Sequence, residues 1–389
     1  MSTPDPTPDL DLAALEGMFA KEFAEAFASL GMFNLAVFGK TGSGKSTLIN
    51  AIFGRDVAAT GVGAPVTRGV VYHRHPDGFL GIYDSEGFET GTSGNAILTG
   101  LRSLIDADAG KPIAERIHAV WYLVRWSDRR FEPAQEQFVR ELAGMGLPVI
   151  LVVTQVPTRD GTIHPDALSV GEHIDSLKLP ISPSGQVVFT NALADRFTDS
   201  PVYGLQHLLD ATYAVVPQAV ERALTAAQVV DVSRKKKEVA TIIRQAVTVA
   251  MGIGAVPVPF ADAAVLVPNQ VTMIARITAA WGLPPSKSRA FAVAGSVVLT
   301  GGATMAGRYA VTSLMKVIPG GAIAGSAISA AVAGTLTKAV GTAWSRVCEY
   351  AWSLPDSDRE AFLSGPEVSA KFTSYLGSGS SNAKELPPP

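Results

Sequence analysis

One short segment has the residue types and spacing needed to hold a polyphosphate. Residues 39–46 fit the pattern G-x-x-x-x-G-K-S, in which glycines let successive backbone N–H groups turn inward around phosphate oxygens. Lys45 would then reach the β- and γ-phosphates, and the hydroxyl of Ser46 would bind Mg²⁺. We therefore predict nucleotide binding through the following residues of this segment: Gly39, Thr41, Gly42, Ser43, Gly44, Lys45, Ser46 and Thr47.

The segments on either side have the order that a phosphate-binding loop requires. Residues 33–38 are an apolar run that predicts a buried strand, and residues 46–53 have helical periodicity. A chance glycine-rich turn would not be expected to have both neighbours. The N-terminus of the predicted helix would also add its positive end to the phosphate site.

A second candidate segment has the pattern D-x-x-G at residues 84–87. It follows a predicted hairpin, whose strands are residues 70–75 and 79–83. In nucleoside triphosphatases such an aspartate holds the hydration shell of Mg²⁺, and the glycine N–H can bond the γ-phosphate. We therefore expect Asp84 at the metal and Gly87 at the γ-phosphate. The loop expected at 54–69, rich in small residues, is the other segment whose length indicates a function.

Further along the chain, strand-like runs alternate with helical stretches, which predicts a doubly wound α/β sheet with right-handed crossovers. Strands are expected at 118–124, 148–153 and 186–190, and helices at 133–143 and 165–179. A long helix should begin at Gly204 and leave the domain near Pro217.

Composition indicates more than one domain and gives no reason to expect nucleic acid as a partner. The chain has 389 residues, 47% of them hydrophobic, and its formal net charge is only -3. The single cysteine, Cys348, excludes an internal disulfide, and the first residues are acidic and proline-rich, unlike a secretory signal. These features favour a cytoplasmic protein.

Taken in order, the motifs resemble those of small GTPases, in particular the bacterial Era, MnmE and septin-like branch. The resemblance covers residues 31–215 and implies a Ras-like P-loop three-layer fold, with GTP or GDP and Mg²⁺ as ligands. It also implies that Thr67, with Thr60 as the alternative, binds Mg²⁺, senses the γ-phosphate and acts in catalysis with Lys45 and Gly87. The base would be contacted by Thr154, Gln155, Asn191 and Ala192.

One departure from the family pattern concerns the base. The guanine-reading tetrad is N/T-K-x-D in the family, whereas residues 154–157 end in Pro157, which offers no carboxylate. Asp160 could reach in from the following loop, or selectivity could be weaker and depend on Gln155 and the Asn191 loop. ATP rather than GTP therefore remains an alternative ligand.

The other departure concerns hydrolysis. Phe88 directly follows the D-x-x-G segment, where Ras-like enzymes have the glutamine that orients the attacking water. An apolar side chain cannot orient water, so intrinsic hydrolysis should be slow. Acceleration could come from Glu86, Glu89 or Arg68, from a partner's arginine, or from homodimerisation across the nucleotide face. A nucleotide-held scaffold that scarcely hydrolyses is the competing hypothesis.

The last third of the chain differs in composition. Residues 245–261, 290–307 and 317–337 carry no charge and are rich in alanine, glycine and valine. Their length is near the threshold for a membrane span, but glycine and proline interrupt them, so we expect helical hairpins. Helices are expected before residue 256 and over 262–281, 289–317 and 322–350. A soluble bundle and a domain that touches the inner face of the membrane both remain open.

The domain organisation follows from these patterns. Residues 1–30 should be a disordered lead and an amphipathic helix, 31–217 the GTPase domain, 218–355 the alanine- and glycine-rich helical domain, and 356–389 a mostly disordered tail. The helical part is similar to an uncharacterised domain that follows the GTPase domain in some bacterial proteins. We expect a regulatory GTPase whose nucleotide state controls this helical domain.

Overall fold

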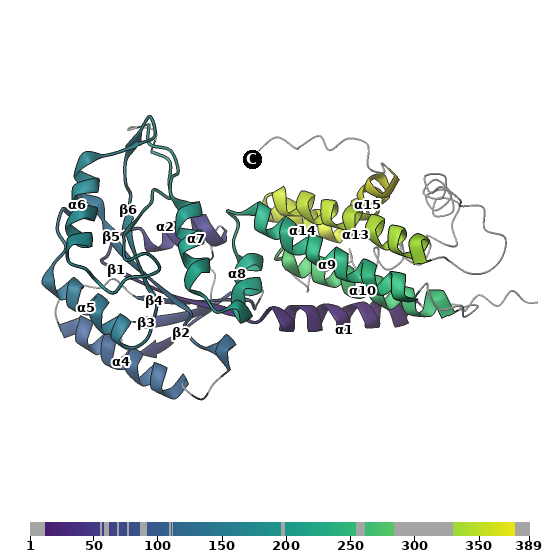
Figure 1. Cartoon of the computed structure of the whole chain (residues 1–389), viewed down its shortest axis with the longest axis horizontal. Helices are drawn as coiled ribbons and strands as arrows, with labels where there is room; N and C mark the ends of the chain where they lie inside the picture. The colour runs from purple at the N-terminus through teal and green to yellow at the C-terminus, as the bar shows by residue number, and fades with distance from the viewer. Residues whose placement is uncertain are drawn as a thin grey trace, which may run out of the picture. The chain divides into compact units, whose positions relative to one another are not determined.

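The computed structural model describes residues 12–54, 57, 62–67, 70–75, 78–85, 92–108, 110, 112–195, 199–253, 261–283 and 330–377. Contacts divide the chain into two units, which are labelled by element in Figure 1. One unit is Leu30–Val232, here called the nucleotide unit. The other, here called the helical unit, combines the residues before Leu30 with those from Ser233 onward.

A seven-stranded sheet organises the nucleotide unit. Its order is β2 (Val62–Thr67), β3 (Val70–Arg74), β4 (Leu80–Ser85), β1 (Phe33–Gly39), β5 (Ala119–Arg125), β6 (Val149–Thr154) and β9 (Val188–Phe189). The strands from β4 to β9 are parallel, and β3 is antiparallel to both of its neighbours. Every residue of β1 and β6 is buried, because parallel strands of this kind are covered by helices on both faces.

Helices cover both faces of the sheet, which gives three layers. Trp121 and Tyr122 are successive residues of β5 and point to opposite faces. Trp121 Nε1 donates to Thr212 Oγ1 of α7 (Leu205–Val215), whereas the Tyr122 ring contacts Phe138 of α5 (Pro133–Gly144). α2 (Lys45–Phe53) packs with α7, and α4 (Thr92–Asp108) and α6 (Pro165–Ser176) share a core with α5.

Short elements complete this unit. They are η1 (Ile113–Glu115), η2 (Trp126–Asp128), the two-residue strands β7 (Thr158–Arg159) and β8 (Thr162–Ile163), η3 (Gln218–Val220) and α8 (Glu221–Ala227). α8 packs against β1 and β4, and Val229 N donates to Ile52 O, so residues up to 232 belong to the nucleotide unit by their contacts.

The predicted α/β class and its hairpin are confirmed, with two differences. The segment expected as a loop at 54–69 contains β2, which pairs with β3 in the register Val62 with Arg74. The helix expected to run from Gly204 ends at Val215, before Pro217. Glycine is needed at 204, since a Cβ there would lie 2.0 Å from Phe189 O and the residue has φ 76°.

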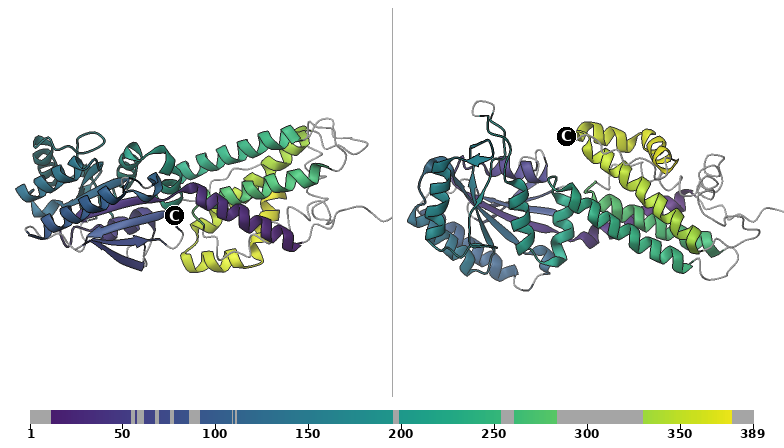
Figure 2. Two further views of the ribbon diagram at one scale, coloured as in Figure 1. Left: turned by 90° about the horizontal axis from the view of Figure 1, so that it is seen from below. Right: turned by 45° about the horizontal axis from the view of Figure 1, so that its top comes forward.

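The helical unit contains α1 (Leu12–Leu30), α9 (Val232–Ile253), α10 (Ala261–Ala280), α13 (Ala330–Ser353), α14 (Asp356–Ser364) and α15 (Glu367–Gly377). Figure 2 shows α9, α10 and α13 running side by side. Gly341 lets α13 approach closely, because a Cβ there would lie 2.8 Å from Met273 Sδ and 2.9 Å from Ile243 Cγ1. The core is aromatic: Trp344 donates to Thr278 Oγ1 at 2.9 Å and packs on Phe372.

α1 belongs to the helical unit up to Ser29. Its Glu22 Oε2 accepts a hydrogen bond from Thr272 Oγ1 of α10 at 2.5 Å. Phe23 is buried, and its ring centroid lies 4.5 Å from that of Phe27. The apolar stripe of this helix therefore packs within the helical unit over the residues whose side chains are described.

The expectation of a mostly disordered tail from residue 356 is wrong for residues 356–377, which form α14 and α15. Phe362, Val368 and Phe372 are buried there, and this burial offsets the ordering of the two helices. The predicted helix at 289–317 lies outside the described residues. Among the helices that are described, none is both long and apolar enough to cross a membrane.

Candidate nucleotide-binding site

The phosphate loop connects β1 to α2, as the motif requires. Gly44 is the N-cap of α2 and has φ 88°, a left-handed conformation that glycine adopts without strain. Gly39 touches the neighbouring strand, because a Cβ there would lie 2.6 Å from Leu123 O of β5. Both glycines are therefore required by local geometry, and they leave the N-terminus of α2 open at the loop.

Lys45 is the cation of this loop. Its Nζ donates to Gly39 O at 3.0 Å and to Lys40 O at 3.5 Å. Partial burial lowers the pKa of Lys45, and the nearby carboxylate of Asp84 opposes that shift. Asp84 lies in β4 opposite Val37 of β1, so the strand register brings the two predicted segments together. A phosphate group would provide the anionic partner that a desolvated ammonium favours.

Two hydrogen bonds tie the phosphate loop to the end of β6. Thr154 Oγ1 donates to Ser43 O at 2.7 Å, and Gln155 Nε2 donates to Gly42 O at 2.8 Å. Thr154 is buried and Gln155 is exposed. The hydroxyl of Ser43 is itself buried and has no hydrogen-bond partner among the described residues. It is available to a bound phosphate oxygen or to water.

The predicted metal-binding residues are described to different extents. Ser46 is exposed at the start of α2, and Asp84 is half-buried. Thr67 ends β2, but its side chain lies outside the described set, as does Gly87 entirely. Thr67 pairs with Val70 of β3, and Val70 pairs with Ser85 of β4, so the ends of β2 and β4 lie at the same edge of the sheet.

The residues present fit Mg²⁺ bound mainly by phosphates and water. No cluster of three or more His, Cys, Asp or Glu side chains suited to a metal occurs in the part of the chain that the structure describes. Mg²⁺ in phosphate sites needs only one or two protein oxygens. Ser46 and Asp84 supply that number.

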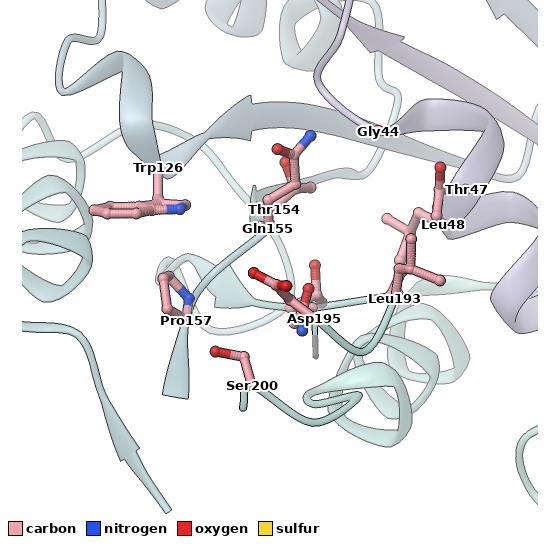
Figure 3. Close-up of a pocket in the computed structure, with 13 residues that line it drawn as sticks. Gly44, Thr47, Leu48, Trp126, Thr154, Gln155, Pro157, Leu193, Asp195 and Ser200 are labelled. Carbon is pink, nitrogen blue, oxygen red and sulfur yellow. The ribbon is translucent and has the colours of Figure 1, made fainter. Parts of the chain in front are cut away.

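A cavity of about 380 Å³ adjoins the phosphate loop, and Figure 3 shows its lining side chains. This volume is in the range of small-molecule sites. All four predicted base-contacting residues line it. The described lining consists of Gly44, Thr47, Leu48, Trp126, Thr154, Gln155, Pro157, Thr190, Asn191, Ala192, Leu193, Asp195 and Ser200.

The cavity wall is built by the loops that follow β6 and β9. Val156 N donates to Thr190 O at 3.0 Å, which joins the two loops directly. Asn191 exchanges two backbone hydrogen bonds with Tyr203, and its side-chain amide donates to Pro201 O at 2.8 Å. Asn191 therefore shapes the loop through its amide nitrogen. Parallel strands end at this edge of the sheet, where α/β folds bind their ligands.

The structure corrects one expectation and adds further lining residues. Asp160 lies in the exposed turn between β7 and β8 and does not line the cavity, so its predicted reach toward the base is not supported. The turn holds it away with φ 51°, followed by Gly161 at 75°. The lining residues that were not predicted to contact nucleotide are Leu48, Trp126, Pro157, Thr190, Leu193, Asp195 and Ser200, although Pro157 and Thr190 belong to segments that the motifs include. Of these, Trp126 had a usable signal, because it lies two residues after the strand predicted at 118–124, at the end of a parallel strand.

Family models match two separate parts of the chain. The dynamin family matches residues 35–79, which include the phosphate loop and β3. A domain of unknown function, DUF697, matches residues 218–361, from η3 into α14. The second match begins at the residue where the helical domain was expected, whereas the contacts place the change of unit at 233. Comparison with curated proteins gives no match.

Several solved structures are similar to part of the chain. A probable GTP-binding protein engB is 19% identical, covering 47% of this chain and 97% of that chain with a TM-score of 0.32. The G domain of the T. maritima FeoB iron transporter is 17% identical, with coverages of 47% and 98% and a TM-score of 0.29. Era of Aquifex aeolicus, bound to GDP and AlF4−, is 16% identical, with coverages of 57% and 68% and a TM-score of 0.32.

The strand order, the phosphate loop and the dynamin-family match agree with one another. The nucleotide unit is an α/β P-loop domain whose phosphate-loop region matches the dynamin family, and a helical domain of unknown function follows it in the chain. The predicted resemblance is thereby confirmed.

Proposed function

We propose that the nucleotide unit binds GTP and GDP with Mg²⁺ and hydrolyses GTP slowly. The observation that carries this proposal is the continuity of the phosphate loop with the cavity: Gly44 belongs to both. A nucleotide with its phosphates around Lys45 would therefore place its base beside Thr154 and Asn191. GTP rather than ATP is supported by the family that matches the phosphate loop.

Different groups of the chain would bind the phosphates, hold Mg²⁺ and sense the γ-phosphate. Backbone N–H groups at the start of α2 and the ammonium of Lys45 would bind them. Ser46 and Asp84, with Thr67 from the end of β2, would hold Mg²⁺, which neutralises charge on the β- and γ-phosphates when bound. Thr67 and Gly87 would sense the γ-phosphate, because Thr67 ends β2 at the same edge of the sheet as the end of β4, and Gly87 completes the D-x-x-G pattern that begins at Asp84.

Slow turnover is proposed because Phe88 stands where a water-orienting glutamine is expected. Acceleration would come from a partner or from dimerisation across the nucleotide face. The slow reaction would let the nucleotide state act as a switch for the helical domain, including its contact with a membrane surface.

One set of measurements tests the proposal. Titration of the nucleotide-free full chain with GTP, GDP and ATP should show micromolar or tighter binding of both guanine nucleotides and weak binding of ATP. Phosphate release from GTP should require Mg²⁺ and rise with protein concentration or with liposomes. A preference for ATP would overturn the guanine assignment, and no hydrolysis under any of these conditions would favour the scaffold alternative.

A further inference from the structure

The base end of the cavity lacks the carboxylate that the fourth residue of the tetrad would supply, because that residue is Pro157. Guanine presents two neighbouring donors, N1–H and the 2-amino group, and a carboxylate can accept from both. Adenine presents one donor and one acceptor on the corresponding edge, so a carboxylate opposes it. A guanine site on this chain therefore needs a carboxylate near Pro157 that does not come from the 154–157 tetrad.

One carboxylate lines the cavity among the residues that the structure describes, and it belongs to Asp195. In Figure 3 its side chain lies between those of Pro157 and Leu193, with Ser200 beside it. Asp195 is exposed and lines the cavity. The cavity lining described contains no lysine, arginine or histidine, so a purine edge would not meet a competing cation from it.

The backbone of Asp195 pairs with that of Ser200. Asp195 N donates to Ser200 O at 2.9 Å, and Ser200 N donates to Asp195 O at 3.1 Å. Ser200 is buried and its Oγ lies 3.4 Å from Thr158 O, next to Pro157. Asp195 and Ser200 are thus paired with each other beside the segment that lacks the carboxylate.

We infer that Asp195 is the guanine-reading residue of this chain, supplied by the loop after β9 in place of the tetrad aspartate. This inference rests on the proposed function and assigns specificity within it. Gln155 would occupy the place of the family's lysine, because it already spans from β6 to Gly42 O. Asp195 would accept hydrogen bonds from guanine N1–H and the 2-amino group.

The substitution Asp195→Asn tests the assignment through a change of ligand. An asparagine amide offers one acceptor and one donor, so it opposes the 2-amino group of guanine but matches the N1–H and 2-oxo groups of xanthine. The affinity for GDP should fall roughly 10- to 100-fold and the affinity for XDP should rise by a similar factor. Asp160→Asn is the matched control, since Asp160 lies outside the cavity lining and should leave both affinities unchanged.

The readout is competition by GDP, XDP and ADP against a fluorescent diphosphate on the full chain, with thermal unfolding as a check of folding. If Asp195→Asn folds normally and keeps the wild-type ratio of GDP affinity to XDP affinity, the assignment of Asp195 is overturned, while the proposed function is unaffected. If Asp160→Asn instead lowers the affinity for GDP and raises the affinity for XDP, the guanine-reading residue is Asp160 and the assignment to Asp195 is overturned. A wild-type chain that binds none of the nucleotides would instead overturn the proposed function.

Discussion

Two lysines, one half-buried and one fully buried, show how differently the two units use this side chain. Lys45 lies in the phosphate loop, half-buried, with two backbone carbonyls of the loop and the carboxylate of Asp84 nearby. Lys235 of α9 is fully buried in the helical unit, and its Nζ lies 3.4 Å from Trp281 O at the C-terminal end of α10. Burial lowers the pKa of both side chains.

The partners of each lysine explain the difference. Arg359 of α14 donates to Ala351 O, Trp352 O and Leu354 O, and so caps the end of α13. Lys235 Nζ likewise donates to Trp281 O, directly after the last residue of α10. The rings of Trp281 and Trp352 lie 6.0 Å apart, so the ends of α10 and α13 are neighbours. In the helical unit these side-chain donors therefore satisfy carbonyl groups at helix ends as part of the fold, whereas the carbonyls around Lys45 can be exchanged for phosphate oxygens. Removing Lys45 should change binding, and removing Lys235 should change stability.

The largest effect is expected for Lys45→Ala. Loss of the ammonium removes charge-assisted hydrogen bonds to two phosphates, so the affinity for GDP should fall at least about 100-fold. Thermal unfolding of the nucleotide-free chain should change little, because the replaced cation was desolvated. Lys178→Ala, at an exposed lysine, is the control for both measurements. Normal nucleotide binding by Lys45→Ala would mean that the phosphate loop is not the binding site.

A smaller effect that depends on the ligand is expected for Ser46→Asn. The asparagine amide is a poorer ligand for Mg²⁺ than the serine hydroxyl. Mutation of residues that only orient a metal ligand already costs about tenfold or more in metal affinity, so the affinity for GTP in the presence of Mg²⁺ should fall at least about tenfold. GDP affinity should stay closer to that of the wild type. Ser46→Thr keeps the hydroxyl and should behave as the wild type. Equal losses for GDP and GTP in titrations with Mg²⁺ would argue against a metal role for Ser46.

In the helical unit, Lys235→Met should change how stability depends on pH. Burial, with the like charge of Arg359, lowers the pKa of Lys235 from 10.5 to about 7. The unfolded chain therefore binds a proton that the folded chain has released between pH 7 and 10.5, and stability due to this group rises with pH across that window. The melting temperature of the wild type should gain several degrees from pH 7 to pH 9 relative to Lys235→Met.

Two further observations decide whether this comparison holds. Lys237→Met, at the exposed lysine two residues further along α9, should keep the wild-type dependence on pH. Nucleotide affinity should be the same in Lys235→Met and in the wild type. Parallel pH profiles for Lys235→Met and the wild type would show that folding does not shift the pKa of Lys235.

Sequence reasoning succeeded where the structure is local in the chain. The phosphate loop is eight consecutive residues between a strand and a helix, so its spacing alone predicts the geometry around Lys45. The base end is assembled from loops after β5, β6 and β9, and its wall depends on hydrogen bonds such as Val156 N to Thr190 O. Thr154 and Asn191 were predicted because a motif names them, whereas Asp195 belongs to no motif.

The helical unit shows the same limit in another form. The hydrophobic runs predicted α10 and most of α13, but no pattern showed that Lys235, in a run of four basic residues, would be buried. A basic run on a helix is normally solvated. Burial of its second member follows from the tertiary placement of the α10 end, which a single sequence does not specify. The same applies to α15, whose Phe372 packs on a tryptophan of α13.

The smallest effect is expected for Gln155, which joins the two ends of the nucleotide site. Its Nε2 donates to Gly42 O at 2.8 Å, and an exposed neutral hydrogen bond contributes about 0.5–1.5 kcal/mol. Gln155→Ala should therefore weaken GDP binding by roughly 2- to 10-fold through a less ordered phosphate loop. Gln155→Lys can reach the same carbonyl and should retain most of the affinity. Calorimetric titration of both variants separates the contributions: an equal loss in the two would mean that the contact with Gly42 is incidental, and that Gln155 acts on the base alone.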